Sequence, residues 1–289
     1  MAEKSEHNLL AEKLGVEPFQ VFADKPEEGY FVAFGKMKGK KVLIKIVRDS
    51  FKKKVDNFAK EILFDQLAKS HNLKHPSSSF KYIDLIGSGK IDGHHWIIRN
   101  FYEGTALAPS KKGYDILATD MIKDKEDTIK KIVLNYNAFR EIKFDQSQEE
   151  IEEFELGIPP LKDNPEYHAE RLKKLSIGDF NPANIILTPE QEVIFTDFEW
   201  LCLDNYMMDI AYLWVFFWRD KILQDYWYKA FVQNEADQEN FRLSVQRLLE
   251  TFDWKDEKIL NDERFLERNK KWHAYYENSK KSIEELIST

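Results

Sequence analysis

One stretch of the sequence decides the fold: Leu175-Ser-Ile-Gly-Asp-Phe-Asn-Pro-Ala-Asn-Ile-Ile-Leu187, followed a few residues later by Val193-Ile-Phe-Thr-Asp-Phe-Glu-Trp200. The glycine and the proline of the first segment predict a tight loop. The apolar runs Ile185–Leu187 and Val193–Phe195 predict two short strands of a hairpin that turns at residues 188–191. Because the strands of a hairpin are antiparallel, the residues before the first strand and after the second meet at one edge.

Three polar side chains are therefore expected at that edge: Asp179, Asn184 and Asp197. Carboxylate and amide oxygens suit Mg2+, which keeps waters and substrate phosphates as its other ligands. A carboxylate set apart from the metal ligands could take the proton of a hydroxyl group during phosphoryl transfer. The pattern thus predicts a magnesium-dependent site for phosphoryl transfer.

These motifs resemble those of the aminoglycoside phosphotransferase and choline kinase family, which shares the protein-kinase-like fold. The family carries a loop of the form H-[GN]-D-x-x-P-x-N, a short hairpin, the sequence D-[WF]-E and then a further aspartate. This chain matches at Asp179, Pro182, Asn184, Asp197 and Asp209. The resemblance implies an α+β, two-lobed fold, with a small N-terminal lobe of antiparallel sheet and one helix, and a large, mainly helical C-terminal lobe.

The resemblance also implies roles for the matched residues. Asp179 would be the catalytic base, and Asn184 and Asp197 would hold Mg2+ against the phosphates of ATP, or of GTP. Asp209 would brace the catalytic loop. The chain departs from the family where the loop histidine is replaced by Ile177, but that histidine braces the backbone and does not react.

The resemblance extends to the first lobe. Lys45, in the run Val42-Leu-Ile-Lys, resembles the strand lysine that contacts the α- and β-phosphates of the nucleotide, and Glu61 on the following helix is its expected ion-pair partner. The alternative is a lysine at the surface of an edge strand and a glutamate on a solvated helix face. The downstream motif favours the functional interpretation.

Two further segments of the first lobe are expected to contact the nucleotide. Residues 23–29 form the loop between the first two strands, and Gly29 is its only glycine, so backbone amides would have to cover the phosphates there with little glycine to help. Asn100, Phe101 and Tyr102 occupy the place where such kinases bind adenine through their main chain.

Hydrophobic periodicity predicts the elements of this first lobe. Strands are expected at Phe19–Phe22, Tyr30–Met37, Lys41–Val47, Lys81–Ile86 and His95–Phe101, with a helix at Val55–Lys69 and a glycine-rich turn at residues 87–93. Residues 1–104 would form the nucleotide-binding lobe with its hinge. Residues 105–289 would form a helical lobe with the catalytic loop and the acceptor pocket.

Composition narrows the class of partner. The formal charge of −8 argues against nucleic acid as a partner, because phosphate contacts need a basic face. The longest apolar run, Met207–Trp218, is too short to span a membrane and predicts a buried helix. A single cysteine, Cys202, excludes an internal disulfide and fits the cytoplasm. The sequence does not indicate an oligomeric state.

The expected partner is a small molecule with a hydroxyl group. Asp-Phe-Glu-Trp at residues 197–200 and the turn Asp204-Asn205-Tyr206 are similar to choline kinases, which favours choline or ethanolamine. The tryptophans of the last helices could cage a quaternary ammonium or form core: Trp214, Trp218, Trp227, Trp254 and Trp272. The alternatives are an aminoglycoside or sugar kinase, and a nucleotide-binding pseudokinase with a regulatory role.

Overall fold

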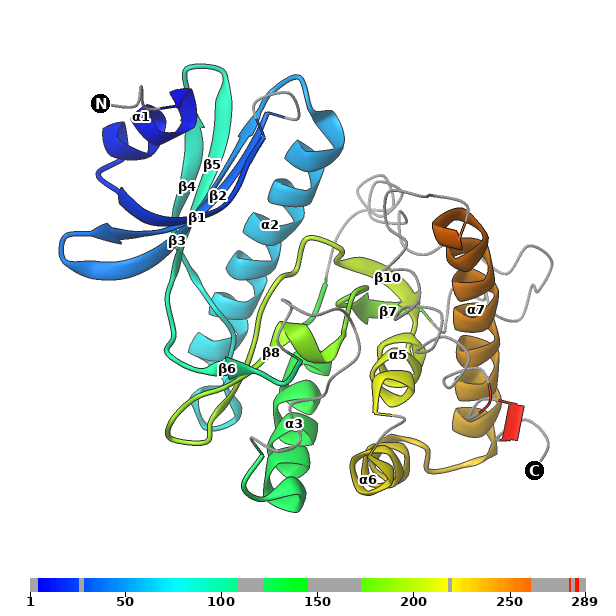
Figure 1. Cartoon of the computed structure of the whole chain (residues 1–289). Coiled ribbons are helices and arrows are strands. Elements are labelled where there is room, and N and C mark those ends of the chain that lie inside the picture. The colour runs from blue at the N-terminus through cyan, green and yellow to red at the C-terminus, as the bar shows by residue number, and fades with distance from the viewer. Residues whose placement is uncertain are drawn as a thin grey trace. The chain divides into compact units, whose positions relative to one another are not determined.

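The computed structural model describes residues 5–25, 29–108, 122–144, 173–217, 220–260, 281 and 284–285 (Figure 1). Contacts divide the chain into two compact units, and each is described by itself. Unit 1 consists of Met1–Ser70 and Tyr82–Glu103, and unit 2 consists of His71–Lys81 and Gly104–Thr289. Sequence analysis divides the chain at residue 104 alone. The structure assigns residues 71–81 to unit 2, where the Lys81 main chain pairs with the Asn135 side chain.

Unit 1 is built on a five-stranded antiparallel sheet with the strand order β1-β2-β3-β5-β4. The strands are β1 (Glu17–Lys25), β2 (Tyr30–Met37), β3 (Lys40–Arg48), β4 (Leu85–Ile91) and β5 (His94–Asn100). β3 is the central strand, and apolar clusters that include residues of α1 and α2 cover its two faces. This strand carries Lys45 into the interior of the unit.

One helix covers each face of this sheet. On α1 (Glu6–Lys13), Leu10 and Ala11 pack with Val42 and Ile44 of β3. On α2 (Lys52–Lys74), Phe58 packs with Val47 and Ile97, and α2 runs along the sheet in Figure 1. The alternation of side chains along β3 produces the two faces, since successive residues of a strand point in opposite directions.

The expected turn at residues 87–93 is wrong, and so is the expected strand that precedes it. Gly87 and Gly89 lie within β4, where they pair with Ile98 and Trp96 of β5. A Cβ atom at Gly89 would come within 2.9 Å of the Trp96 ring, so glycine is needed there to make room for the indole. The chain turns at Asp92 and Gly93, which have φ angles of 47° and 74°, as a two-residue hairpin turn requires.

Unit 2 is mainly helical. Its helices are α3 (Lys125–Arg140), α5 (Met208–Phe216), α6 (Lys221–Phe231) and α7 (Glu235–Leu260), with short 3-10 turns η2 (Pro76–Ser78) and η6 (Pro182–Asn184). The strands are β6 (Thr105–Ala106), β7 (Lys173–Ser176), β8 (Ile185–Leu187), β9 (Val193–Phe195) and β10 (Cys202–Asn205). β8 and β9 have the bounds that sequence analysis predicts, and α5 confirms the buried helix.

Stacked aromatic rings form the core of unit 2. Tyr136 of α3 stacks on Phe180 with ring centroids 5.2 Å apart, and Trp227 of α6 packs on Phe231 at 4.6 Å. Trp227 is fully buried and its indole N–H donates to the Ile210 carbonyl at 2.8 Å. Phe180 thereby ties the loop between β7 and β8 to the core.

The sequence predicts that the tryptophans of the last helices either form a cage for a ligand or belong to the core, and the structure describes the side chains of two of them. Trp214 and Trp227 are buried in the core, so neither offers a face to a quaternary ammonium. The side chains of Trp218, Trp254 and Trp272 lie outside the described residues. Among the described residues, no helix combines the length and the apolarity that crossing a bilayer requires.

Gly29 and Gly39 form a matched pair for testing the packing of unit 1. Both have positive φ, at 55° and 79°. A Cβ atom at Gly29 would lie 2.6 Å from Cε2 of Phe51, whereas nothing lies within 4 Å at Gly39. We expect Gly29→Ala to lower the free energy of unfolding by about 2–3 kcal/mol and Gly39→Ala by about 1 kcal/mol, measured by urea unfolding. Equal losses would contradict this account of Gly29.

Candidate functional site

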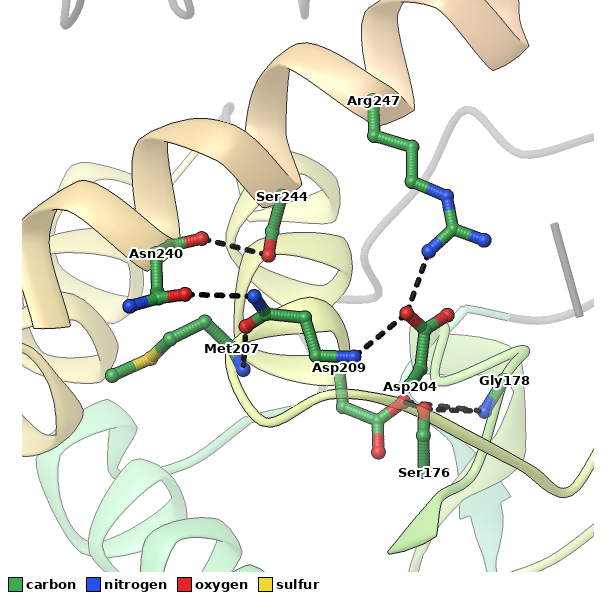
Figure 2. A network of polar contacts seen from close by, with 9 residues as sticks. Ser176, Gly178, Asp204, Met207, Asp209, Asn240, Ser244 and Arg247 are labelled. Atoms are coloured by element: carbon green, nitrogen blue, oxygen red, sulfur yellow. Dashed lines mark hydrogen bonds and ion pairs between the residues drawn. The ribbon is translucent and has the colours of Figure 1, made fainter. Parts of the chain in front are cut away.

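A buried carboxylate holds the 177–184 loop of unit 2 (Figure 2). Asp209, in the first turn of α5, is 2% exposed. It accepts hydrogen bonds from the Ser176 hydroxyl at 2.7 Å, from the Ile177 N–H at 2.8 Å and from the Gly178 N–H at 3.2 Å. The Tyr136 hydroxyl donates a fourth at 3.2 Å. The bracing that the resemblance implies for Asp209 is therefore present in the geometry.

The balance of burial and hydrogen bonding sets the charge of Asp209. Burial raises its pKa to about 6, and the donors at Ser176, Ile177 and Gly178 oppose that rise. The side chain of Ile177 is itself buried in the core. Main-chain bracing of the loop thus comes from Asp209.

Gly178 gives the loop its turn. Its φ angle is 79°, which favours glycine. A Cβ atom there would overlap the carbonyl oxygen of Trp200. Any other residue would have to displace that segment, so Gly178 fixes the direction in which the chain reaches Asp179.

Asp179 is half-buried and tied at both its side chain and its main chain. Its Oδ1 accepts a hydrogen bond from the Tyr212 hydroxyl at 2.9 Å. Its carbonyl oxygen accepts from the Asn181 N–H at 2.9 Å and from Asn184 Nδ2 at 2.8 Å. The structure thereby brings Asp179 and Asn184 together, as the sequence predicts. The side-chain atom of Asn184 that bonds to the loop backbone is the nitrogen Nδ2.

The β8–β9 hairpin brings Asp197 to the same edge. Ile185 pairs with Phe195, and the Thr196 N–H donates to the Asn184 carbonyl at 3.0 Å. Asp197 follows directly with a φ of 65°. A left-handed conformation costs a residue other than glycine about 1–2 kcal/mol, although aspartate tolerates it better than most. Strained positions of this kind cluster at functional sites.

A second polar network, also drawn in Figure 2, joins β10 to α7. Arg247 Nη1 lies 2.6 Å from Asp204 Oδ1 in a pair whose two side chains are almost fully buried. Asn205 Nδ2 donates to Asn240 Oδ1 at 2.8 Å, and the Ser244 hydroxyl donates to the Asn240 carbonyl. Because β10 pairs with β7, this network supports the strand that leads into the 177–184 loop.

In unit 1 the structure pairs Lys45 with Glu61. Lys45 Nζ lies 3.0 Å from Glu61 Oε1, and the two residues are 6% and 2% exposed. The alternative of a surface lysine and a solvated glutamate is therefore wrong. Glu61 also forms an ion pair with Arg99 of β5, which is 2% exposed. The buried carboxylate of Glu61 thus forms ion pairs with two cations, Lys45 and Arg99.

The remaining predicted residues of unit 1 also have defined surroundings. Gly29 accepts the Arg48 N–H through its carbonyl oxygen at 2.8 Å. Asn100 Nδ2 and the Tyr102 hydroxyl both donate to Asp84 Oδ1, at 2.9 and 3.3 Å. Asp84 therefore anchors the side chains of the expected adenine-binding segment.

Phe101, the third residue of that segment, packs by its ring. Its centroid lies 5.0 Å from that of Phe34 in an edge-to-face arrangement. Lys41 Nζ lies 5.2 Å from the same ring. With its side chain held between these two groups, Phe101 leaves main-chain atoms as the means of contacting a base.

Sequence reasoning missed Arg99 and Tyr212. Side chains alternate between the two faces of β5, which places Arg99 on the same face as the buried Ile97. An arginine on the buried face of a strand was therefore the available signal. For Tyr212 the signal was its spacing from Asp209, because residues three apart on a helix share a face. Neither signal identifies the residue with which Arg99 or Tyr212 interacts.

Comparison with known proteins supports the fold. No family model and no curated protein sequence matches the chain. The crystal structure of a thermostable mutant of aminoglycoside phosphotransferase APH(4)-Ia, apo form, matches with a TM-score of 0.57 at 11% identity, over 98% of this chain and 99% of that one. Spectinomycin phosphotransferase APH(9)-Ia, in complex with ADP and spectinomycin, gives 0.55 at 12%, over 96% and 98%.

An aminoglycoside phosphotransferase from Alicyclobacillus acidocaldarius gives a TM-score of 0.51 at 14% identity, over 100% of this chain and 97% of that one. The chain therefore has the protein-kinase-like fold of the aminoglycoside phosphotransferases, as the resemblance implied. The expected fold class, with a small antiparallel-sheet part and a large helical part, is confirmed.

The raised pKa of Asp209 predicts how stability depends on pH. Between the ordinary value of 3.8 and the folded value of about 6, the unfolded chain has lost a proton that the folded chain keeps. The contribution of Asp209 to stability therefore falls as pH rises through this window. We expect the free energy of unfolding of the wild type, relative to that of Asp209→Asn, to fall by about 2–3 kcal/mol from about pH 4 to about pH 6 and then level off.

Urea unfolding of both proteins at several pH values measures this difference. Because asparagine does not titrate, every other group cancels in the comparison. A difference that stays flat across the window, or rises, would show that Asp209 does not titrate as its burial predicts.

Proposed function

We propose that the protein is a small-molecule kinase that transfers the γ-phosphoryl group of ATP to a hydroxyl group of a small acceptor, with Mg2+ as cofactor. The observation that carries this proposal is the arrangement at the base of the β8–β9 hairpin. There the Asn184 amide holds the Asp179 main chain, and backbone pairing places Asp197 beside Asn184. The match to aminoglycoside phosphotransferase structures adds that the surrounding fold suits this chemistry.

The donor set fits a magnesium ion. Asn184 would offer its amide oxygen, since its nitrogen is engaged with the loop, and Asp197 would offer a carboxylate. Hard oxygen donors of this kind, one of them charged, suit Mg2+ bound together with nucleotide phosphates. When bound, the ion supplies charge neutralisation at the phosphates.

Asp179 would act on the acceptor. The residue is half-buried, and its carboxylate is held by the hydroxyl of Tyr212. It would accept the hydroxyl proton as the acceptor oxygen attacks phosphorus. Phosphoryl transfer needs little covalent help from a protein, so positioning of this kind accounts for most of what the loop must do.

Residues of unit 1 would bind the nucleotide. Lys45, fixed by Glu61, would contact the α- and β-phosphates. Gly29 would approach the phosphates, and Asn100, Phe101 and Tyr102 would hold adenine through main-chain atoms. Structures of APH(4)-Ia have been solved with ADP and with AMP-PNP, each together with hygromycin B, which supports a nucleotide and a small acceptor as the ligands of this fold.

For the acceptor we propose an amino alcohol such as choline or ethanolamine, on the similarity of residues 197–200 and 204–206 to choline kinases. The burial of Trp214 and Trp227 removes part of the aromatic support for that choice. An aminoglycoside is the second candidate, because the matching structures contain hygromycin B or spectinomycin. We place the reaction in the cytoplasm, which fits a chain with a single cysteine, Cys202, whose side chain is buried.

Replacement of the proposed base tests the reaction. With choline, ethanolamine, spectinomycin, hygromycin B and a hexose offered in turn, ADP release should identify an acceptor for the wild type. Asp179→Asn should then lower kcat by about 100-fold or more with the KM for ATP nearly unchanged. Asp225→Asn, a half-exposed carboxylate on α6, is the matched control and should keep wild-type turnover.

Two outcomes would count against this proposal. An Asp179→Asn variant with wild-type kcat would remove Asp179 from the role of base. Binding of MgATP without turnover on any acceptor would favour a regulatory pseudokinase.

Replacement of the proposed metal ligand tests the cofactor. Asp197→Ala should abolish magnesium-dependent nucleotide binding in a calorimetric titration with AMP-PNP, because the only charged oxygen donor of the proposed set is lost. The same titration in EDTA gives the metal-free baseline. Unchanged affinity in the presence of Mg2+ would exclude Asp197 as a ligand.

A further inference from the structure

Helix α5 contacts the 177–184 loop at two points with two different groups. Asp209 accepts the main-chain N–H groups of Ile177 and Gly178. Tyr212, three residues further along and on the same side of the helix, donates its hydroxyl to the carboxylate of Asp179 at 2.9 Å. One short helix therefore fixes both the path of the loop and its acidic side chain.

We infer that Tyr212 is a positioning residue for the phosphoryl transfer. Its hydrogen bond to Oδ1 of Asp179 holds the plane of that carboxylate so that Oδ2 faces the acceptor hydroxyl. This inference rests on the proposed function, in which Asp179 takes the proton of the acceptor. It adds a residue outside the motifs from which that function was proposed.

The hydrogen bond from Tyr212 limits the rotation of the Asp179 carboxylate, which would otherwise be free. The terminal torsion of an aspartate side chain is broad and roughly two-fold, so packing alone defines the carboxylate plane poorly. Asp179 is only half-buried, which leaves still more freedom. A hydrogen bond from a neutral hydroxyl to a charged oxygen is among the stronger kinds, and it ties one oxygen while leaving the other to accept a proton.

Tyr212 is a rigid donor. The residue is 7% exposed, and its ring packs against that of Phe216, one helical turn away, with centroids 5.2 Å apart. The described part of α5 is buried along its whole length. Because the ring is held in this way, the position of the Tyr212 hydroxyl is fixed. The same helix also holds the loop backbone through Asp209.

The chemical step fits this assignment. As the acceptor oxygen bonds to the γ-phosphorus, the bond from that phosphorus to the ADP oxygen breaks, and the hydroxyl proton passes to Oδ2 of Asp179. Oδ1 then becomes the carbonyl oxygen of a neutral acid and still accepts the hydrogen bond of Tyr212. The Tyr212 hydroxyl therefore orients the base before and after the transfer without giving up its own proton.

Removal of the hydroxyl alone tests the assignment. Tyr212→Phe keeps the ring and should lower kcat about 10-fold, a loss in the usual range for a hydrogen bond to a charged group, with the KM for ATP unchanged. In the Asp179→Asn background the same substitution should change kcat less than about 2-fold, because two residues that act through one group are not additive.

A second tyrosine serves as the control. The hydroxyl of Tyr82 donates to Asp65 Oδ1 at 3.1 Å, so Tyr82→Phe removes a hydrogen bond of the same kind at another place in the chain. This variant should keep the wild-type kcat. A loss at Tyr82 as large as that at Tyr212 would mean that any lost tyrosine hydroxyl slows the enzyme, and would overturn the assignment.

The remaining outcomes separate this inference from the proposed function. Two results obtained with a wild type that turns over an acceptor would overturn the inference alone. One is a Tyr212→Phe variant with the wild-type kcat, and the other is a double variant in which the losses of kcat at Tyr212 and Asp179 multiply. If the wild type turns over no acceptor, the proposed function fails and the inference with it. Should Tyr212→Phe not fold, Phe216→Leu takes its place, because it removes the ring that packs against Tyr212. Its effect on kcat should likewise be much smaller in the Asp179→Asn background than in the wild type. If the losses of kcat at Phe216 and Asp179 multiply, the inference is overturned.

Discussion

The buried carboxylate of Asp209 is the constraint on which unit 2 depends. Its burial disfavours the charge, and the hydroxyl of Ser176 with the N–H groups of Ile177 and Gly178 compensates for that cost. Those three donors are consecutive residues at the end of β7. The same interaction that makes a buried carboxylate tolerable therefore also fixes the start of the loop that carries Asp179.

Much of the site could be predicted because its parts are close in sequence. The turn before Asn184, the hairpin and the aspartate after it lie within one short segment, where hairpin geometry leaves few arrangements. Lys45 and Glu61 are also close in sequence, but their residue types alone fit a surface lysine and a solvated glutamate equally well. That pair was predicted from the resemblance to a family, which rests on the motif at residues 179–199.

Other features could not be predicted, since they depend on what packs across from a residue. Gly87 and Gly89 are typical of a turn, yet they lie in β4 because the indole of Trp96 fills the space above them. The aromatic residues Trp214 and Trp227 suggest a cage as readily as a core until their burial is known. The partner of Tyr212 is thirty-three residues away, and the intervening fold brings the two together.

The two cations that share Glu61 limit how far α2 can move away from the sheet of unit 1. In many kinases the equivalent helix is a switch, and activity follows its position. Here α2 is attached to the sheet through both Lys45 of β3 and Arg99 of β5. Swinging the helix outward would separate two desolvated ion pairs at once, which is costly in a buried setting. These two ion pairs therefore resist an outward movement of α2 within unit 1. Under the proposed kinase function, activity would then follow the supply of substrate and not the position of α2.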